Sequence, residues 1–404
     1  MKVFIVTREP FPHGMAAVKR IVCYAKAWMS QGIKCEILIY TRTEVYGKIP
    51  KNMAGKGVYE GIPFMYMKNT PFRESNVVVR RFNDYMDRYR LKRYLMKNLS
   101  VGDVVYAYNG GDAHSLSILK TVHSLGASYM QELCELPFGT SEETPKRIKK
   151  RKAFEQKLMP RLDGMIAISD ALVEYARQHC SPNAHIVKIP ILVDFPKYEM
   201  ADESEKASIP YIFHSGTLYQ QKDGFLSMLK AFAKASKQLP FDVHFVSTGN
   251  PKGTRHEAEI NEIINTHDIN DKIVFTGYLT NEELRTYLSK AAFVVVNKLT
   301  TQQNIYCFST KLGEYMAASK AVVVTNVGEA MNWLNHEKDA FIIEPNNVDL
   351  LADAMIRMFR EGDFRKTIGV NACKTCKGSF SIEANAARLK SIIDNVSLTR
   401  CHNF

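Results

Sequence analysis

Residues 304–329 read NIYCFSTKLGEYMAASKAVVVTNVGE, a polar turn followed by two different hydrophobic patterns. Ser309 and Thr310 are residue types that begin helices, so we expect a helix from this point. The β-branched run at 321–325 then suits a strand buried on both faces. A helix followed by such a strand is typical of a parallel α/β sheet. Three apolar residues at four-residue spacing should face the core: Phe308, Leu312 and Met316.

The start of this expected helix also has the chemistry of an anion site. A helix N-terminus with N–H groups, the two hydroxyls and Lys311 is suited to binding a diphosphate. Glu314 lies one turn further along and could accept two hydrogen bonds from a ribose diol. These residues alone also fit an ordinary helix–strand unit with a surface ion pair.

Length and composition limit the protein class. The chain has 404 residues, which favours two domains or one large one, with 46% hydrophobic and 24% charged residues. The sequence has no apolar run near the ~18 residues that span a bilayer, and residues 3–6 are too short for a signal peptide. We therefore expect a cytoplasmic protein with reduced cysteines. The single CxxC at 373–376 has no second pair, so we expect no metal there.

The charge favours an anionic partner. The formal net charge is +12 and the pI is about 9.1, which fits nucleic acid, an anionic membrane or a phosphate-bearing substrate. Many of the basic residues fall on two expected helices, 76–99 and 145–159. Phe82, Met86 and Tyr89 give the first an apolar stripe. Either helix could be a solvated face or a membrane-surface contact. RNA-binding signatures with interleaved aromatics are lacking, so we expect no nucleic acid.

The first half of the chain begins with a strand–loop–helix–strand unit at residues 2–40. Gly14 in its loop would let backbone approach a ligand closely. A later strand, 103–108, ends at Tyr108 and leads into the loop that contains Asn109 and His114. Polar residues at the carboxyl end of such a strand look like part of a binding site.

The same order of elements begins again after a polar, breaker-rich linker at 190–207. A strand at 211–214 leads through a glycine loop into a helix expected at 222–239. We therefore predict two doubly wound Rossmann-like α/β domains, 1–195 and 196–380, facing each other across a cleft. The segment 381–404 should form a helix that packs back on the first domain. This arrangement suits an enzyme that holds a nucleotide on one side and a second substrate on the other.

Two motifs of the second domain resemble those of the retaining glycosyltransferases of family 4, which have the GT-B fold, in particular enzymes of bacterial cell-surface polysaccharides. The first motif is the loop GTLYQQKDG at 216–224, and the second is FSTKLGEYMAASKAVV at 308–323. Gly14, the unit at 103–119 and the turn Gly277-Tyr278 fall in the order that this family shows. The resemblance covers nearly the whole chain.

The resemblance implies transfer of a sugar from a UDP- or GDP-sugar to a glycan or lipid-linked acceptor, with retention and with neither cofactor nor metal. In this scheme Lys222 neutralises the leaving diphosphate, and Glu314 holds the ribose. His114 is the second expected catalytic residue. The expected donor-binding residues are Gly14, Gly216, Lys222, Tyr278, Ser309, Thr310, Lys311 and Glu314, and the expected acceptor-binding residues are Tyr108, Asn109 and His114.

Three positions depart from the family pattern. Thr217 stands where a basic residue usually follows the loop glycine, and Tyr306 replaces the first glutamate of a paired-glutamate motif. The histidine often found at the end of the first-domain strand is missing, with tyrosines at 106 and 108. Two other function classes stay open: a nucleotide-sugar epimerase that needs no acceptor, and a non-enzymatic protein that binds anions or membranes. An enzyme that acts on a lipid-linked acceptor would be a peripheral protein on the inner membrane face.

Overall fold

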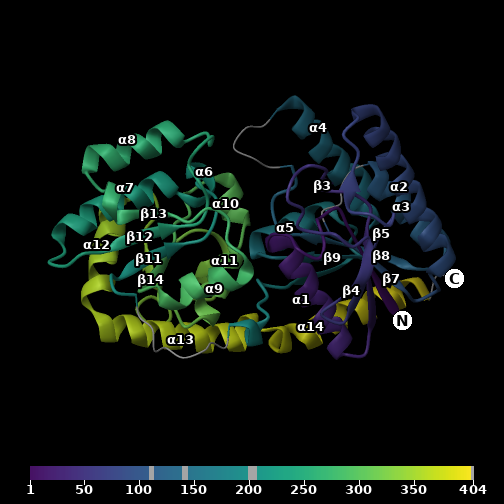
Figure 1. Cartoon of the computed structure of the whole chain (residues 1–404). Coiled ribbons are helices and arrows are strands. Elements are labelled where there is room, and N and C mark those ends of the chain that lie inside the picture. The colour runs from purple at the N-terminus through teal and green to yellow at the C-terminus, as the bar shows by residue number, and fades with distance from the viewer. Residues whose placement is uncertain (109–112, 139–143, 199–206, 402–404) are drawn as a thin grey trace. The chain divides into compact units, whose positions relative to one another are not determined.

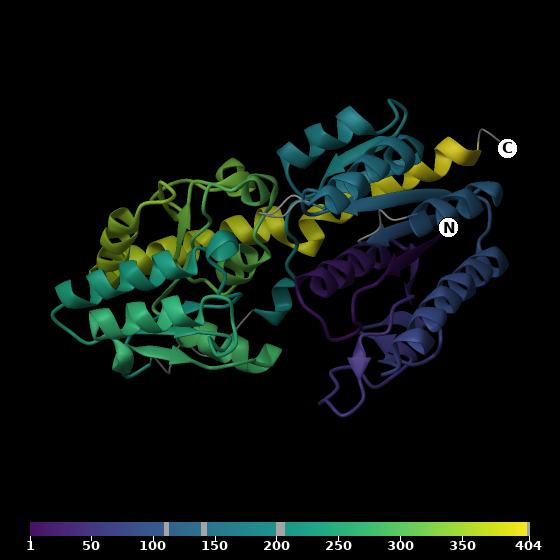
Figure 2. The same ribbon diagram turned by 90° about the horizontal axis from the view of Figure 1, so that it is seen from above.

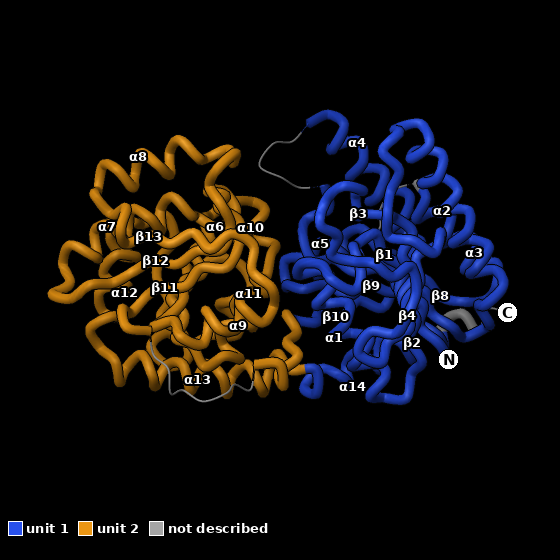
Figure 3. The backbone as a smooth tube through the Cα atoms, in the orientation of Figure 1, with its two compact units in different colours: residues 1–190, 382–404 blue, residues 191–381 orange. Residues whose placement is uncertain are grey.

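The computed structural model describes residues 1–108, 113–138, 144–198 and 207–401. They divide into two compact units, Met1–Pro190 with Ile382–Phe404, and Ile191–Ser381 (Figure 3). Residues 191–195, which we expected in the first domain, thus belong to unit 2. In each unit, helices pack around a largely parallel sheet (Figure 1). Both units are Rossmann-like, as the sequence predicts.

The sheet of unit 1 has eight strands in the order β10-β9-β8-β7-β1-β2-β5-β4, all parallel except the β4–β5 pair. The chain places β2 on one side of β1 and β7 on the other, so the topology switches between β1 and β7. The strands are β1 Lys2–Thr7, β2 Lys34–Ile39, β4 Lys56–Tyr59, β5 Ile62–Tyr66, β7 Val104–Tyr108, β8 Ser128–Leu133, β9 Gly164–Ala167 and β10 His185–Lys188. Two short strands, β3 Glu44–Val45 and β6 Phe72–Arg73, pair separately.

The helices of unit 1 include one from the far end of the chain. That helix, α14 Ile382–Cys401, contacts α1, β8 and β10, and Figure 2 shows it running along this unit. Trp28 on α1 is fully buried and donates from Nε1 to the carbonyl of Leu389 at 2.9 Å. The remaining α-helices are α1 Ala16–Ser30, α2 Val77–Asn98, α3 Ala113–Ser124, α4 Pro145–Ala153 and α5 Asp170–His179. The helix expected at 145–159 is α-helical only to Ala153, because π and 3-10 turns follow.

The sheet of unit 2 has six parallel strands in the order β13-β12-β11-β14-β15-β16. The chain adds β12 and β13 on one side of β11 and then β14 to β16 on the other. The switch point of this doubly wound sheet therefore lies between β11 and β14, where ligands bind in such folds. The strands are β11 Tyr211–His214, β12 His244–Ser247, β13 Ile273–Phe275, β14 Phe293–Val296, β15 Val322–Thr325 and β16 Phe341–Ile343.

The helices of unit 2 differ from the expectation in two places. The helix expected at 222–239 is split, because Gly224 adopts φ +60° and separates α6 from α7. A long helix, α13 Gly362–Phe380, was missed altogether. It carries both residues of the CxxC, and Cys376 is buried with its thiol on the carbonyl of Gly313 at 3.4 Å. The α-helices are α6 Gln220–Asp223, α7 Phe225–Gln238, α8 Glu257–His267, α9 Asn281–Lys290, α10 Gln302–Tyr306, α11 Thr310–Ala317, α12 Val348–Arg360 and α13.

The helix and strand within 304–329 form as predicted. The helix is α11, and Phe308, Leu312 and Met316 are buried as expected. The strand is β15, whose four residues are all buried. Across the described ranges, helices with the length and apolarity needed to cross a bilayer are lacking.

Candidate functional site

The strongest candidate site lies at the switch point of unit 2, where β11 and β14 end side by side. Their parallel pairing sets Phe213 opposite Val294. The loop after β11 runs from Ser215 to Gly224, and the chain leaves β14 through Asn297 and Lys298. The Asn297 amide donates to the carbonyl of Gly224 at 3.0 Å, which holds the two loops together.

Gly216 makes room for a lysine from another element. A Cβ at this position would lie 1.9 Å from the Nζ of Lys311, so any larger residue would displace that side chain. The Gly216 amide donates to Thr248 Oγ1 at 2.9 Å, which fixes the loop on the end of β12. The glycine therefore lets Lys311 reach across the loop from α11.

A single buried carboxylate gathers two lysines at this point. Lys298 Nζ donates to one oxygen of Asp223 at 2.7 Å, and Lys311 Nζ donates to the other at 3.1 Å. Burial would raise the pKa of Asp223, but the two lysines hold it well below its usual range. The Thr217 hydroxyl donates to the same carboxylate at 2.6 Å. Thr217, which stands where the family usually has a basic residue, thus adds a hydrogen bond to the Asp223 carboxylate.

This cluster carries more positive than negative charge. Burial lowers the pKa of Lys311, against the opposing effect of Asp223, and the neighbouring charges of Lys298 and Lys222 lower it further. Two lysines therefore contact one carboxylate, and Lys222 adds its charge to the environment of Lys311. Such a surplus is unfavourable by itself and becomes favourable when an anion binds.

The base of the site is uncharged and closely packed. Burial lowers the pKa of His214 to about 3, so its imidazole is neutral near pH 7, and its Nδ1 lies 3.1 Å from Ser247 Oγ. The Tyr315 hydroxyl accepts a hydrogen bond from the amide of Ser215 at 2.8 Å. Because Tyr315 belongs to α11, this bond ties the start of the glycine loop to that helix.

The start of α11 contributes the remaining polar groups. Ser309 is the N-cap residue, as predicted, but its side chain makes no capping hydrogen bond. Thr310, Lys311 and Glu314 follow on the helix and are each half-buried. The α11 N-terminus thus lies beside the loop after β11, joined to it through the contact between Lys311 and Asp223.

The structure brings most of the predicted donor-binding residues together. Six of them lie on the loop after β11 or on the first turns of α11: Gly216, Lys222, Ser309, Thr310, Lys311 and Glu314. Tyr278 follows β13, at the same carboxyl edge of the sheet but two strands away, and its side chain is 73% exposed. The assignment of these residues to a donor stays a prediction.

The predicted residues of unit 1 do not form a comparable group. A Cβ at Gly14 would lie 2.4 Å from Val18 Cγ2, so close packing already requires a glycine there. Tyr108 is 5% exposed, and its hydroxyl lies 3.5 Å from Cys134 Sγ. His114 lies in the first turn of α3, with its ring 5.5 Å from that of Tyr40. Asn109 lies outside the described residues.

A buried ion pair occupies the carboxyl side of the unit 1 sheet instead. Arg20 and Glu132 are 2% and 5% exposed and meet at 2.7 Å. The same guanidinium donates to the carbonyls of Ile189 and Pro190 at 2.9 and 2.6 Å. The Tyr106 hydroxyl donates to the other oxygen of Glu132 at 2.5 Å. Glu132 is therefore part of a buried network.

Sequence reasoning missed Asp223 and Lys298. Asp223 lies inside the quoted loop 216–224, next to Lys222, and was given no role of its own. Lys298 directly follows Asn297 at the end of the buried strand β14. A charged residue just beyond such a strand is the signal that could have pointed to it, because neighbouring strand ends converge. Within the described ranges, no group of three or more His, Cys, Asp and Glu side chains could hold a metal ion.

Comparison with known proteins relates this site to sugar transfer. Residues 209–361 match the sequence family described as glycosyl transferases group 1, a range that includes the whole cluster around Asp223. A stretch of 113 residues is 29% identical to an uncharacterized glycosyltransferase of Methanocaldococcus jannaschii. That alignment spans 28% of this chain and 28% of the relative.

Solved structures resemble the chain over almost its whole length. A sucrose-phosphate synthase from Thermosynechococcus elongatus matches with a TM-score of 0.74 and 16% identity, covering 99% of this chain and 100% of that one. The Anabaena protein HepE in complex with UDP-glucose matches with a TM-score of 0.71 and 15% identity, covering 97% and 98%. The chain therefore has the GT-B fold, and residues 209–361 in unit 2 resemble the glycosyl transferases group 1 family.

Proposed function

We propose that this protein is a glycosyltransferase that moves a sugar from a nucleotide sugar to a glycan or lipid-linked acceptor, with retention of anomeric configuration. The observation that carries this proposal is the lysine-rich cluster around Asp223, inside the region that matches the glycosyl transferases group 1 family. Structural neighbours bind UDP and UDP-glucose, so a UDP-sugar is the first donor to test.

In the proposed mechanism the protein mainly stabilises the leaving diphosphate. Lys222 and Lys311, with the N–H groups at the start of α11, meet the charge that develops as the bond to the sugar breaks. Preorganised cations and N–H dipoles are worth most where charge appears in the transition state. Glu314 accepts from the ribose diol, and Tyr278 lies beside the base. His114, with Tyr108 and Asn109, is assigned to the acceptor.

The proposed retention rests on the resemblance to the retaining glycosyltransferases, and the contacts of two carboxylates argue only against a covalent sugar–enzyme intermediate. Asp223 is held by two lysines and a threonine, and Glu329 accepts from Trp333 and Asn332. Neither is placed to attack a sugar as a nucleophile. The departing phosphate would instead take the acceptor proton, as the family resemblance implies.

A panel of UDP- and GDP-sugars tests the proposal, with the melting temperature and the reaction products as readouts. We expect one nucleotide class to raise the melting temperature and its sugar to pass to an added acceptor with retained configuration, observed by NMR. An inverted product would contradict the mechanism. Release of free epimerised sugar without acceptor would favour the epimerase alternative, and no shift with any nucleotide would overturn donor binding.

We further propose that the acceptor is lipid-linked and that the enzyme works in the cytoplasm, against the anionic inner membrane face. Helix α2 supports this, because four large apolar side chains spaced four, three and four residues apart are exposed. These are Val78, Phe82, Tyr85 and Tyr89, exposed by 76%, 62%, 67% and 49%. Their exposed stripe lies among basic residues, a pattern typical of helices that lie in a membrane interface.

Helix α4 adds charge without contributing to the core. It has no buried residue, and six of its nine residues are Lys or Arg. Each basic residue near an anionic surface contributes ~1 kcal/mol, so several together can hold a protein reversibly.

Co-sedimentation with anionic and neutral vesicles tests this contact. We expect salt-sensitive binding to anionic vesicles that weakens when Phe82 and Tyr85 become serine, or when residues 149–152 are neutralised. Equal, negligible binding to both vesicle types would favour a freely soluble acceptor.

A further inference from the structure

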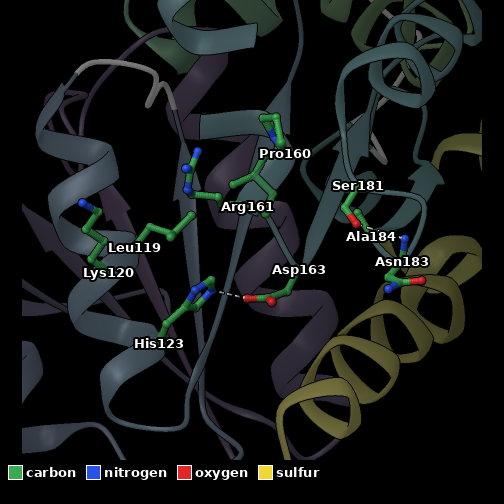
Figure 4. A pocket seen from close by; sticks show the side chains of 10 residues that line it. Leu119, Lys120, His123, Pro160, Arg161, Asp163, Ser181, Asn183 and Ala184 are labelled. Carbon is green, nitrogen blue, oxygen red and sulfur yellow. Dashed lines mark hydrogen bonds and ion pairs between the residues drawn. The ribbon is translucent and has the colours of Figure 1, made fainter. Parts of the chain in front are cut away.

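Unit 1 contains a pocket of its own. It lies at the edge of the sheet formed by the amino ends of the strands, opposite to their carboxyl ends. The pocket has a volume of about 560 Å³ and lies where β9 and β10 begin (Figure 4). Its walls come from the last turns of α3 and from the segments that lead into β9 and β10. A pocket of this size is in the range that holds a small molecule.

The charged groups of this pocket are mostly basic. Lys120, His123 and Arg161 line it together with one carboxylate, that of Asp163. Asp163 is 5% exposed, accepts from the amide of Tyr129 at 2.8 Å and lies 2.7 Å from His123 Nε2. These two contacts fix the carboxylate. Lys120 is exposed, and the exposed Arg161 donates from Nη1 to the carbonyl of Lys157 at 2.6 Å, so a ligand would bind its remaining N–H groups.

The polar groups are separated across the pocket. In Figure 4, Lys120, His123 and Arg161 lie on the side of α3, and Ser181 and Asn183 lie on the other side with Asp163 between them. One side therefore offers a guanidinium and an ammonium, which suit a phosphate group. The other offers a hydroxyl, an amide and a carboxylate, which suit the hydroxyl groups of a polyol.

The rest of the lining narrows the ligand class. It consists of Leu119, Pro160, Leu162 and Ala184, so Phe, Tyr and Trp are lacking among the described residues that line this pocket. A nucleobase usually stacks on such a large ring, and the lack of one argues against a nucleotide. We infer that this pocket binds a small phosphorylated polyol, such as a sugar phosphate, with the phosphate on Lys120 and Arg161 and the hydroxyls toward Asp163 and Asn183.

This site is separate from the donor-binding residues proposed above, which lie in unit 2. The inference does not depend on the proposed function, and either can fail alone. Helix α3 connects the pocket with the acceptor residue proposed at its first turn, because His114 and His123 lie on the same helix. A ligand here would therefore contact the helix that carries His114.

Calorimetry on the full chain tests the inference with three probes: glucose 6-phosphate, inorganic phosphate and glucose. We expect glucose 6-phosphate to bind more tightly than either fragment. Replacing both cations, Lys120→Gln with Arg161→Gln, should weaken it by about tenfold or more, since each loses a charge-assisted hydrogen bond. Asn183→Ala should weaken glucose 6-phosphate and leave inorganic phosphate unchanged.

Two matched controls separate this site from general anion binding. Lys157→Gln removes a nearby exposed cation that does not line the pocket, and should leave the affinity unchanged. Lys222→Ala, in unit 2, should also leave it unchanged. The inference would be overturned if glucose 6-phosphate fails to bind, if inorganic phosphate binds equally well, or if Lys222→Ala abolishes binding while the double variant does not.

Discussion

Each unit of the chain buries an ionic cluster at the carboxyl side of its sheet, and the two clusters differ in charge balance. In unit 1, Arg20 and Glu132 form a one-to-one pair whose hydrogen bonds end on protein atoms. In unit 2, Asp223 contacts two lysines, and Lys222 lowers the pKa of one of them, Lys311. A balanced pair needs no further ion to offset its charge, whereas a cluster with surplus positive charge favours an anionic ligand. The difference distinguishes a structural network from a candidate site.

Breaking the balanced pair should have the largest effect. Arg20→Met leaves Glu132 buried without its partner and removes the donors to two carbonyls. We expect unit 1 to lose ~3–5 kcal/mol of unfolding free energy. The two tryptophans, Trp28 in unit 1 and Trp333 in unit 2, allow denaturant unfolding to be followed separately in W333F and W28F backgrounds.

The matched control for this experiment is the double variant Arg20→Met with Glu132→Gln, which removes both charges and should recover part of the loss. A loss below about 1 kcal/mol in the single variant would mean that the pair is not structural. An equal loss in the Trp333 signal would mean that the effect is not confined to unit 1.

Removing a charge from the surplus cluster should instead affect turnover. Lys222→Ala should reduce the rate about a hundredfold or more, because a lost leaving-group cation typically costs ~3 kcal/mol of barrier. Its stability should stay near that of the parent, since Asp223 keeps Lys298 and Lys311. Lys230→Ala, an exposed lysine on α7, is the matched control. Turnover within a few-fold of the parent would contradict the assignment of Lys222.

The sequence predicted the local structure around residues 304–329 more fully than the long-range contacts of either unit, for a physical reason. Around residues 304–329, local signals agree: N-cap residues, a four-residue apolar spacing and a β-branched strand. These signals correctly predicted the helix α11 and the strand β15. Long-range partners leave no such local signal. Lys298 meets Asp223 only because β14 lies next to β11 in the sheet, an order that the spacing of strands does not reveal.

The unit 1 predictions relied on residue type at strand ends, which does not fix burial. Tyr108 ends a strand, yet its ring is inside the core, because a sheet covered on both faces buries every residue of its central strands. Helix α13 was missed because its apolar periodicity is weak: five of its nineteen residues are buried. Its glycines and polar residues read as loop.

A third variant tests binding of the nucleotide-sugar donor separately from the rate of sugar transfer. Glu314→Gln keeps the side-chain shape but loses charge-assisted acceptance from the ribose diol. We expect donor binding to weaken by ~1.5–3 kcal/mol, with a smaller loss for the free sugar phosphate, which has no ribose. Calorimetry with both ligands measures the difference. Equal losses for the two would place Glu314 near the sugar or phosphate, and unchanged affinity would remove it from the site.

A chelator should have the smallest effect. It tests whether the surplus charge of unit 2 is sufficient to stabilise the leaving diphosphate without a metal ion. If Lys222, Lys298 and Lys311 together with the α11 N-terminus neutralise the diphosphate, a divalent cation is not needed to stabilise the leaving group. EDTA should then leave turnover within about twofold of its value without chelator, in the parent and in Glu314→Gln alike. In Lys222→Ala, added magnesium should recover part of the lost rate, because it supplies the charge that the lysine provided. Loss of parent activity in EDTA, restored by magnesium or manganese, would mean that the lysine cluster is insufficient. The lysine cluster of unit 2 would then need a bound metal ion to neutralise the diphosphate.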